Sequence, residues 1–445
     1  MPNPLLDAGS RISAWAKAVK QARRRRRTAN KLKAGKARRE ASPATFIGVT
    51  GSSAKSTATS LLSHILRGYD SVTEQIERNT QATLTNTLWR LQNERYVVAE
   101  LGLSEADSIR EMAELLKPDV AIVTLIGLEH YSVFRTREAV ALEKGTLVEN
   151  IRPGGLAVLN ADDPHVMAMA ARTTERIVTF GQSAEADYRA TDIHAAFPER
   201  LSLTVEWKEG RLVLQTRYVA EHFWLPVAAA VATALELGVP PPIVAERVAG
   251  CEPIRNRCGV ISTSDGPQFI VDTMKAPWHS LQLAFKALDD ATAPRKRLVL
   301  GHMSDFPGAD AKYRDAYRAG RAVADQVMFV GDHSHRSKAS QQDRDERRFV
   351  PFTTPREVAE HIRSTATPGE LILLKGSSNL HLERIALSWI EDVKCWVPAC
   401  GLPQGCEACG LYRIPYEIHR GRKKWRRQDR LRVLLRPWKL WTRPQ

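Results

Sequence analysis

Lys55, Ser56 and Thr57 close a run of small residues that could bind a phosphate group. The run, Gly51-Ser52-Ser53-Ala54, follows an apolar stretch and precedes apolar residues at helical spacing, which predicts a strand, a loop and a helix. Backbone N–H groups of such a loop can point at a phosphate, Lys55 adds a positive charge, and Ser56 offers a hydroxyl to magnesium. The alternative is an ordinary turn of small residues between a strand and a helix.

Two further polar side chains follow apolar runs that read as strands. Glu100 comes at the end of residues 96–99, and His130 follows residues 120–127. Strands that alternate with helical stretches predict a parallel sheet, whose carboxyl ends share one edge. We therefore expect Lys55, Glu100 and His130 to lie together, with Glu100 as a magnesium ligand. An edge carboxylate and a surface histidine are the simpler alternatives.

The elements that position these residues require more than one domain. A chain of 445 residues exceeds one ordinary core, so we expect two α/β domains with terminal extensions. No window of roughly 18 uncharged apolar residues and no signal peptide is visible, which predicts a cytoplasmic protein with reduced cysteines. The expected segments are an arm at 1–43, an ATP-binding domain at 44–250, a smaller Rossmann-like domain at 251–392 and a tail at 393–445.

The net charge of +15 is concentrated at the two ends of the chain. Residues 1–43 hold thirteen Lys and Arg against two acidic residues, and residues 411–445 hold twelve against two, so the body between them is mildly acidic. The arm is either a solvated basic segment or a peripheral anchor on an anionic membrane, which the tryptophans of the tail also favour. Nucleic acid is a weaker alternative, because no base-reading module is recognisable.

Four cysteines fall within 15 residues of the tail, at Cys395, Cys400, Cys406 and Cys409. Their number and the final C-x2-C spacing suit zinc in a cytosolic chain, although the first gap is wide. An iron–sulfur cluster and unliganded thiols remain alternatives. Cys251 and Cys258 are expected to be core or interdomain residues.

Ordered motifs along most of the chain resemble those of one known family. The segments are 50–57, 79–81, 99–102, 126–130, 143–145, 160–164, 255–257, 270–276, 300–303 and 373–378. Together they resemble the Mur ligase family, ATP-dependent ligases that add amino acids or dipeptides to the peptidoglycan precursor. Within it, the likeness is strongest to the branch that adds D-alanyl-D-alanine to UDP-N-acetylmuramoyl-tripeptide.

The resemblance implies ATP and magnesium as cofactors and assigns roles to individual residues. The nucleotide-binding residues are Gly51, Ser52, Ser53, Ala54, Lys55, Ser56, Thr57, Asn160, Arg257 and Asp272, and the substrate-binding residues are Lys275, Lys375 and Ser377. Ser56 and Glu100 would hold one magnesium ion, and His130 with a carbamylated Lys144 a second. In simpler readings Lys144 is a plain helix lysine, Arg257 and Asp272 form an interdomain ion pair, and Lys375 caps a strand.

Several positions depart from the family pattern. Ala54 and Asn256 replace glycines, residues 274–278 replace a nucleotide-contacting stretch, and Phe223 and Pro226 stand where relatives have asparagines. The methyl group of Ala54 would crowd a phosphate if the loop requires a positive φ. Only about 45 residues precede the loop, so we expect no N-terminal domain for the UDP-sugar and do not favour a UDP-linked substrate.

The sequence therefore predicts an ATP-dependent carboxylate–amine ligase that works through an acyl phosphate on a cell-wall or related peptide. A poly-γ-glutamate-type ligase is a second hypothesis. A non-catalytic nucleotide-binding or membrane scaffold module is a third, motivated by Ala54, the altered 274–278 stretch and the basic ends.

Overall fold

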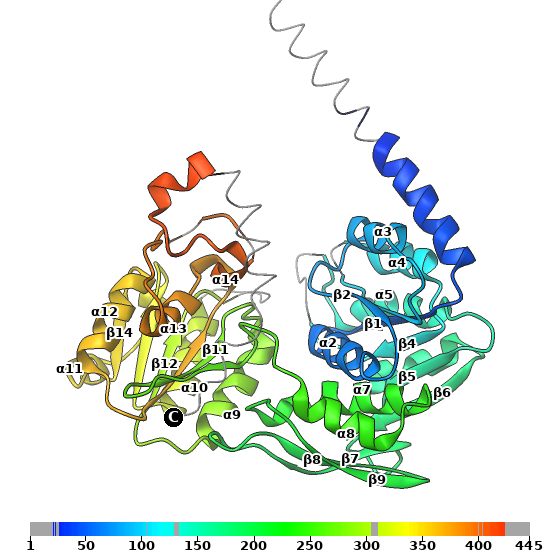
Figure 1. The fold of residues 1–445 in the computed structure, drawn as a ribbon. Coiled ribbons are helices and arrows are strands. Elements are labelled where there is room, and N and C mark those ends of the chain that lie inside the picture. Colours follow the sequence, from blue (N-terminus) through cyan, green and yellow to red (C-terminus); the bar gives the residue numbers. More distant parts are fainter. Residues whose placement is uncertain are drawn as a thin grey trace, which may run out of the picture.

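The computed structural model describes residues 21, 23, 26–103, 105–128, 133–303, 310–398, 400–402 and 404–422. Two α/β units follow one another along the chain, each built on its own sheet, and they stand side by side in Figure 1. Both sheets are dominated by parallel strands, which confirms the predicted fold class.

The first unit is built on a nine-stranded sheet with the order β2-β3-β1-β4-β5-β6-β7-β8-β9. Its first seven strands in that order are parallel, while β8 and β9 are antiparallel additions at one edge. The strands are β1 (Thr45–Thr50), β2 (Val72–Gln75), β3 (Tyr96–Glu100), β4 (Val120–Val123), β5 (Leu156–Asn160), β6 (Arg176–Gly181), β7 (Tyr188–His194), β8 (Ser202–Trp207) and β9 (Gly210–Gln215). β1 lies inside the sheet, between β3 and β4, so the loop that follows it is flanked by the ends of both neighbouring strands.

Helices cover both faces of this sheet, so its central strands are apolar throughout. In β3, Tyr96 and Val98 belong to the core on the α2 and α7 side, while Val97 and Ala99 belong to the core on the α3, α4 and α5 side. The helices are α2 (Lys55–Leu66), α3 (Gln81–Trp89), α4 (Ser108–Leu116), α5 (Arg137–Glu149), α6 (Pro164–Met167), α7 (Trp224–Glu236) and α8 (Pro241–Gly250), with 3-10 turns η1 (Ala168–Arg172) and η2 (Glu221–Phe223).

The second unit carries a six-stranded sheet with the order β10-β11-β15-β12-β13-β14, in which only β10 is antiparallel. Its strands are β10 (Gly259–Ile261), β11 (Gln268–Asp272), β12 (Lys296–Leu300), β13 (Gln326–Val330), β14 (Phe349–Phe352) and β15 (Leu371–Lys375). Its helices are α9 (Leu281–Asp290), α10 (Asp310–Val323), α11 (Gln341–Asp345), α12 (Pro355–Thr365) and α13 (Glu383–Ile390), with turns η3 (Trp278–Ser280), η4 (Ser334–Ser337) and η5 (Ser378–Leu380). β11 and β15 are adjacent parallel strands, and their last residues, Asp272 and Lys375, lie opposite each other.

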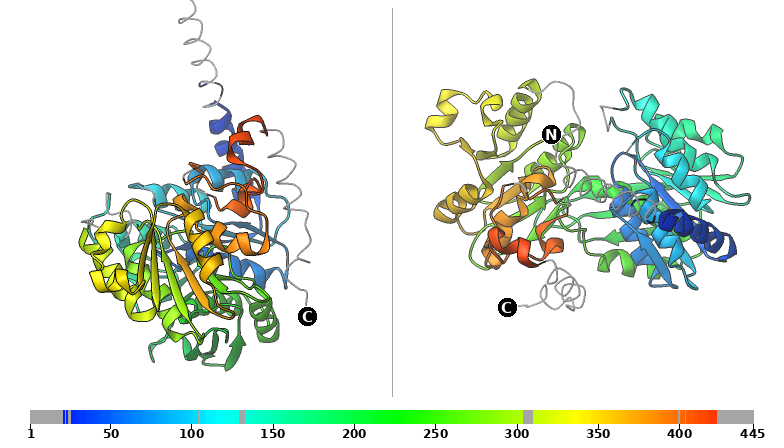
Figure 2. Two further views of the ribbon diagram at one scale, coloured as in Figure 1. Left: turned by 90° about the vertical axis from the view of Figure 1, so that its left-hand side faces the viewer. Right: turned by 90° about the horizontal axis from the view of Figure 1, so that it is seen from above.

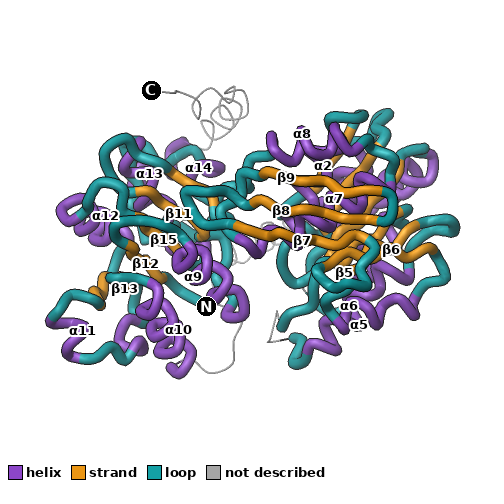
Figure 3. Tube along the Cα trace, turned by 90° about the horizontal axis from the view of Figure 1, so that it is seen from below, coloured by secondary structure: helices purple, strands orange, loops and turns teal. Residues whose placement is uncertain are grey.

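The two units share part of one hydrophobic core. Strands β7 to β9 reach from the first unit toward the second (Figure 3), and the Thr292 backbone N–H donates to the Phe197 carbonyl at 2.7 Å. Buried Phe197 and Leu201 belong to the same cluster of apolar side chains as Leu281 and Leu288 of α9. This shared core fixes the two sheet edges relative to each other.

The chain extends beyond the two units at both ends. Residues 26–41 form a helix whose C-terminal end packs on the first unit, so part of the predicted basic arm belongs to the body. Arg39 is 3% exposed, donates to the Leu116 and Lys117 carbonyls and lies over the Phe46 ring. After α13, the extension contains α14 (Cys406–Cys409) and η6 (Tyr416–Arg422). Among the described residues, no helix has the length and apolar character needed to cross a membrane.

Candidate active site

The phosphate loop between β1 and α2 is held open by backbone geometry. Gly51 has φ 144°, and a Cβ there would lie 1.9 Å from Thr124 Oγ1, so only glycine fits. Thr124 Oγ1 donates to the Ser53 carbonyl at 2.6 Å, and the Ser52 N–H donates to the Leu125 carbonyl at 2.8 Å. The end of β4 therefore supports the loop from below.

Ala54 adopts the left-handed conformation that the family glycine would take, with φ 68° and ψ −12°. This conformation costs a residue with a Cβ about 1–2 kcal/mol. The methyl group packs against the hydrophobic core. The sequence concern about a positive φ was therefore justified, while the methyl group has a packing role of its own.

Two buried lysines meet at one backbone oxygen of the loop. Lys55 and Lys144 both donate to the Gly51 carbonyl, Lys144 at 3.0 Å, and the Lys144 side chain has no exposed surface. Two ammonium groups that donate to the same oxygen atom repel each other, and more strongly in a buried site than in water. Conversion of Lys144 to a carbamate, which the family resemblance implies, would replace this repulsion by attraction.

Glu100 lies at the end of β3 beside the loop and accepts three hydrogen bonds. Its donors are Ser56 Oγ at 2.8 Å, Asn79 Nδ2 at 2.9 Å and the Glu77 N–H at 3.0 Å. Burial alone would raise the pKa of Glu100, but Lys55, the Glu77 N–H, Arg257 and the Ser56 hydroxyl hold it below the usual value. The carboxylate is therefore ionised at neutral pH although it is only 2% exposed.

These oxygen atoms fit magnesium. Ser56 and Glu100 present a hydroxyl and an anionic carboxylate in direct contact, which is the donor chemistry that magnesium prefers. Lys144 lies across the loop at Gly51, where a carbamate would add oxygen atoms. His130, the remaining predicted ligand, lies outside the described residues.

The three predicted nucleotide-binding residues outside the loop have partners of different kinds. Asn160 is buried, and its Nδ2 donates to the Thr124 carbonyl at 2.8 Å, which ties β5 to the end of β4. Arg257 approaches the first unit from the second, with Nε 3.9 Å from Glu77 Oε1 and without a hydrogen bond to that buried Nε. Asp272 instead forms a 2.6 Å ion pair with Lys375.

The predicted substrate-binding residues gather at the facing edge of the second sheet. Lys375 Nζ donates to Asp272 and to the Lys275 carbonyl at 3.0 Å, and the Ser377 N–H donates to the His302 carbonyl at 3.0 Å. Burial lowers the pKa of His222 from the first unit to about 4, and Asp272 opposes this shift while Lys375 adds to it. Polar groups from both units thus meet at one junction.

The structure adds residues to the site that were not among the predicted ligands. Glu77 and Asn79 position Glu100, Thr124 supports the loop, and His222 faces Asp272. The motif at residues 79–81 signalled Asn79, but nothing in the sequence singles out the backbone N–H of Glu77. The predicted roles of all these site residues remain predictions.

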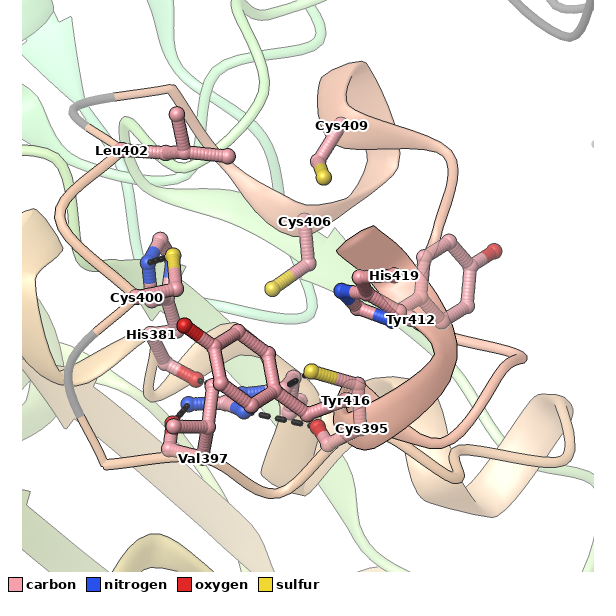
Figure 4. A pocket seen from close by; sticks show the side chains of 11 residues that line it. His381, Cys395, Val397, Cys400, Leu402, Cys406, Cys409, Tyr412, Tyr416 and His419 are labelled. Atoms are coloured by element: carbon pink, nitrogen blue, oxygen red, sulfur yellow. Dashed lines mark hydrogen bonds between the residues drawn. The ribbon is translucent and has the colours of Figure 1, made fainter. Parts of the chain in front are cut away.

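The four C-terminal cysteines surround one cavity away from the phosphate loop (Figure 4). None of these four cysteines forms a disulfide, and His381 and His419 line the same cavity. Cys251 and Cys258 are buried elsewhere, as expected for core or interdomain residues.

Comparison with known proteins agrees with this architecture. Residues 49–234 match the Mur ligase middle domain, and residues 256–378 match the glutamate ligase domain of Mur ligases. The chain is 26% identical over 379 residues to the UDP-N-acetylmuramoyl-tripeptide–D-alanyl-D-alanine ligase of Mycobacterium tuberculosis, covering 79% of this chain and 74% of the relative. The corresponding Bacillus subtilis ligase is 24% identical, covering 78% of this chain and 76% of the relative.

Solved structures show the same fold. MurF from Acinetobacter baumannii superposes with a TM-score of 0.72 at 23% identity, covering 82% of this chain and 80% of that one. MurF from Thermotoga maritima, solved with ADP, gives 0.70 at 21% identity, covering 81% and 83%. The two domain matches together span more than two thirds of the chain. The chain therefore belongs to the Mur ligase family, whose members are ATP-dependent ligases.

Proposed function

We propose that the chain activates a peptide carboxylate with ATP and transfers the acyl group to an amine at the junction between its two units. The supporting observation is the contact of Ser56 with Glu100 beside a loop on which Lys55 and Lys144 converge. These groups concentrate positive charge and metal-binding oxygens where β- and γ-phosphates would lie. Phosphoryl transfer depends mainly on such positioning and charge neutralisation.

The reaction has two steps. A carboxylate oxygen of the acid attacks the γ-phosphorus of ATP, ADP leaves, and an acyl phosphate forms. The amine nitrogen then attacks the acyl carbon, phosphate leaves, and the nitrogen loses a proton. Magnesium, when bound, neutralises charge on the phosphate oxygens.

The residues of the chain divide this work. Lys55 would orient and neutralise phosphate oxygens, while Ser56 and Glu100 would hold the metal and Lys144 would carry the carbamate. Asn160, Arg257 and Asp272 would contact the nucleotide. Lys275, Lys375 and Ser377 line the facing sheet edge, where the second substrate would bind.

The relatives indicate a class of substrate. Both curated relatives described above are ligases that add D-alanyl-D-alanine to a muramoyl tripeptide. We infer a cell-wall peptide as the acid and a short D-amino-acid peptide as the amine. The zinc predicted from the four cysteines would lie outside this reaction centre.

The test measures ADP release with panels of peptide carboxylates and amines, and adds hydroxylamine as a trap. ADP release that needs an acid, together with a hydroxamate product, supports an acyl phosphate. Lys55→Ala and Glu100→Ala should abolish ADP release while each variant still unfolds in one cooperative transition, whereas Lys36→Ala, on the exposed N-terminal helix, should behave as wild type. Unchanged turnover in either site variant would contradict the assignment.

A second proposal concerns the basic ends of the chain, which we place on an anionic membrane surface. Support comes from the run Arg23 to Arg27 and from the exposed Lys33 and Lys36 on the helix that leads away from the body (Figure 1). Flotation with anionic vesicles should carry the protein at low salt and release it at high salt. Absence of salt-sensitive flotation would contradict this placement.

A further inference from the structure

The extension after α13 folds back on the second unit and encloses a cavity of about 460 Å³. The side chains that could ligate a metal around it are His381, Cys395, Cys400, Cys406, Cys409 and His419. Figure 4 shows them projecting from three separate stretches of chain toward the same space. Thiolates and imidazoles are the ligands that zinc binds most often, so the chemistry of this lining fits a metal ion.

His381 is oriented as a metal-binding histidine. Its Nε2 lies 3.0 Å from Cys400 Sγ, and its Nδ1 lies 3.2 Å from Glu383 Oε1. Both His381 and Glu383 are 2% exposed. A metal-ligating histidine almost always donates its other ring N–H to a carboxylate or carbonyl, which fixes the ring and the tautomer. Here Glu383 has that role and leaves Nε2 facing the thiol.

Cys406 and Cys409 stand at the two ends of the short helix α14. The ligand atoms of His381, Glu383 and Cys406 lie within 4.8 Å of one another. The Cys406 N–H donates to Glu383 Oε1 at 2.9 Å, so the carboxylate also anchors the helix that carries these thiols. The C-x2-C spacing is the one that zinc sites use most often for a pair of neighbouring ligands.

The chain repeats the tetrapeptide Ala-Cys-Gly-Leu at 399–402 and 408–411. In both copies the glycine after the cysteine, Gly401 and Gly410, has φ 71°. The backbone therefore turns in the left-handed sense directly after Cys400 and again after Cys409. The two copies thus share a left-handed glycine next to a thiol that lines the cavity.

Cys395 differs from the other three cysteines. Its Sγ lies 3.9 Å from Arg384 Nη1, which also donates to the Cys395 carbonyl at 2.6 Å. Arg384 is fully buried and donates further to the Val397 carbonyl at 2.8 Å. The neighbourhood of Cys395 is thus organised around a guanidinium group, which a metal cation would repel.

We propose that His381 Nε2 and the thiolates of Cys400, Cys406 and Cys409 bind one zinc ion, with Glu383 as the outer partner of His381. This set differs from the four cysteines predicted from the sequence, because His381 takes the place of Cys395. Three S–H bonds break as three Zn–S bonds form, and the protons leave to solvent. Of these groups, only His381 and Cys406 belong to the close cluster with Glu383, so the proposal requires Cys400 and Cys409, which line the same cavity, to move toward the ion when it binds.

The zinc ion would attach the extension to the ligase junction. Thr273 Oγ1, next to Asp272, donates to Glu383 Oε2 at 3.4 Å, and Arg255 pairs with Glu407 at 3.1 Å. Toward the first unit, Arg78 Nη2 lies 3.5 Å from Gln404 Oε1. Figure 1 shows the extension, in orange and red, on top of the second unit, and Figure 2 shows it from two further sides. We therefore expect metal binding to stabilise the arrangement of the two units.

The test uses the full chain, purified from zinc-supplemented cells, with metal content measured by mass spectrometry. Wild type and Cys395→Ser should each hold one zinc ion per chain, while Cys400→Ser, Cys406→Ser, Cys409→Ser and His381→Ala should lose it. Glu383→Gln should weaken zinc binding about 10–100-fold in competition with a chelator. Less than stoichiometric zinc in the wild type, or loss of zinc in Cys395→Ser, would overturn the proposed set.

A second measurement does not depend on how the variants fold. Cobalt added to metal-depleted wild-type protein should give thiolate charge-transfer bands with an intensity for three thiolates and the visible bands of a tetrahedral ion. Chelation of the native metal should lower the melting temperature, and added zinc should restore it. Octahedral cobalt spectra, or a melting temperature that does not respond to chelation and zinc, would contradict the site.

Discussion

The most informative single substitution is Glu100→Gln, which keeps the shape of the side chain and removes its charge. Glu100 accepts hydrogen bonds from Ser56, Asn79 and the Glu77 N–H. A glutamine has only one acceptor oxygen, so its NH2 group must face at least one of these donors. The variant therefore loses an anionic metal ligand, and its NH2 group faces another hydrogen-bond donor, so that donor has no acceptor.

The expected magnitudes follow from this geometry. One buried donor left without an acceptor costs about 1–3 kcal/mol, partly offset because no charge is then buried. We expect a loss of about 1–2 kcal/mol in the free energy of unfolding. A carboxylate and a dication 4 Å apart interact by about 8 kcal/mol at an effective dielectric constant of about 20. Loss of even half of that interaction in the transition state corresponds to about 10³-fold in turnover.

The assay combines ADP release with urea denaturation, and Glu94→Gln is the matched control. Glu94 also accepts from a threonine hydroxyl and a backbone N–H, but it precedes β3 at the opposite end of the strand. We expect Glu94→Gln to keep full turnover. Turnover within tenfold of wild type for Glu100→Gln would refute the magnesium role. A variant that also loses its cooperative transition would show a structural role instead.

We also expect the difference in unfolding free energy between wild type and Glu100→Gln to depend on pH. The pKa of Glu100 is lower in the folded protein than in the unfolded chain, so its ionised form stabilises the fold above the unfolded value, about 4.3. That contribution is lost as the pH falls through the lower folded value. The stability difference between wild type and Glu100→Gln should therefore shrink in acid, and a constant difference would contradict the ionised, hydrogen-bonded carboxylate.

Three other predictions address the loop and the junction. Ala54→Gly should change the free energy of unfolding by less than about 1 kcal/mol, because glycine relieves the backbone strain but makes the unfolded chain more flexible. Ala54→Val should lower the free energy of unfolding by about 2 kcal/mol. An unchanged melting temperature for the valine variant would contradict the left-handed φ. Lys144→Arg should lower turnover about 100-fold, and bicarbonate labelled with 13C should give a carbamate signal in wild type alone; equal signals would exclude Lys144. The pKa of His222 is lowered to about 4 in the folded protein, so the unfolded chain binds an extra proton between about pH 6.5 and 4. The free energy of unfolding should therefore decrease as the pH is lowered through this range. In urea titrations, His222→Gln should reduce this dependence on pH, and an unchanged dependence would contradict the assignment.

Much of the site could be predicted from the sequence because several of its residues lie at the carboxyl ends of parallel strands. Glu100 follows an apolar run, and the rule that parallel strands share one carboxyl edge was enough to place it beside Lys55. The donors that position Glu100 were harder to foresee. The Glu77 N–H reaches Glu100 in a left-handed backbone conformation, with φ 64° at Glu77. Glycine is the residue that usually indicates this conformation in a sequence, and position 77 is a glutamate. His381 is likewise distant in sequence from the C-x2-C motif at Cys406 and Cys409, and only the folding of the extension brings them to one cavity.

Charge runs were the least reliable signal for structure. The basic arm was expected to be a solvated or membrane-bound segment as a whole, yet Arg39 is almost fully buried. Its guanidinium group satisfies carbonyls at the end of α4, and those carbonyls have no intrahelical partners. Whether an arginine is solvated or caps a helix depends on tertiary neighbours, which sequence composition does not contain.

The docked N-terminal helix determines where the chain can be shortened for crystallisation or spectroscopy. The match to the Mur ligase middle domain begins at residue 49, which invites truncation just before β1. Such a truncation would remove Arg39 from the Phe46 ring and from Asp119, whose carboxylate accepts the Phe46 N–H at 2.8 Å. These contacts together are worth about 3 kcal/mol, and β1 leads directly into the phosphate loop. A fragment that is to keep the phosphate loop as it is in the full chain should therefore retain the helix that carries Arg39.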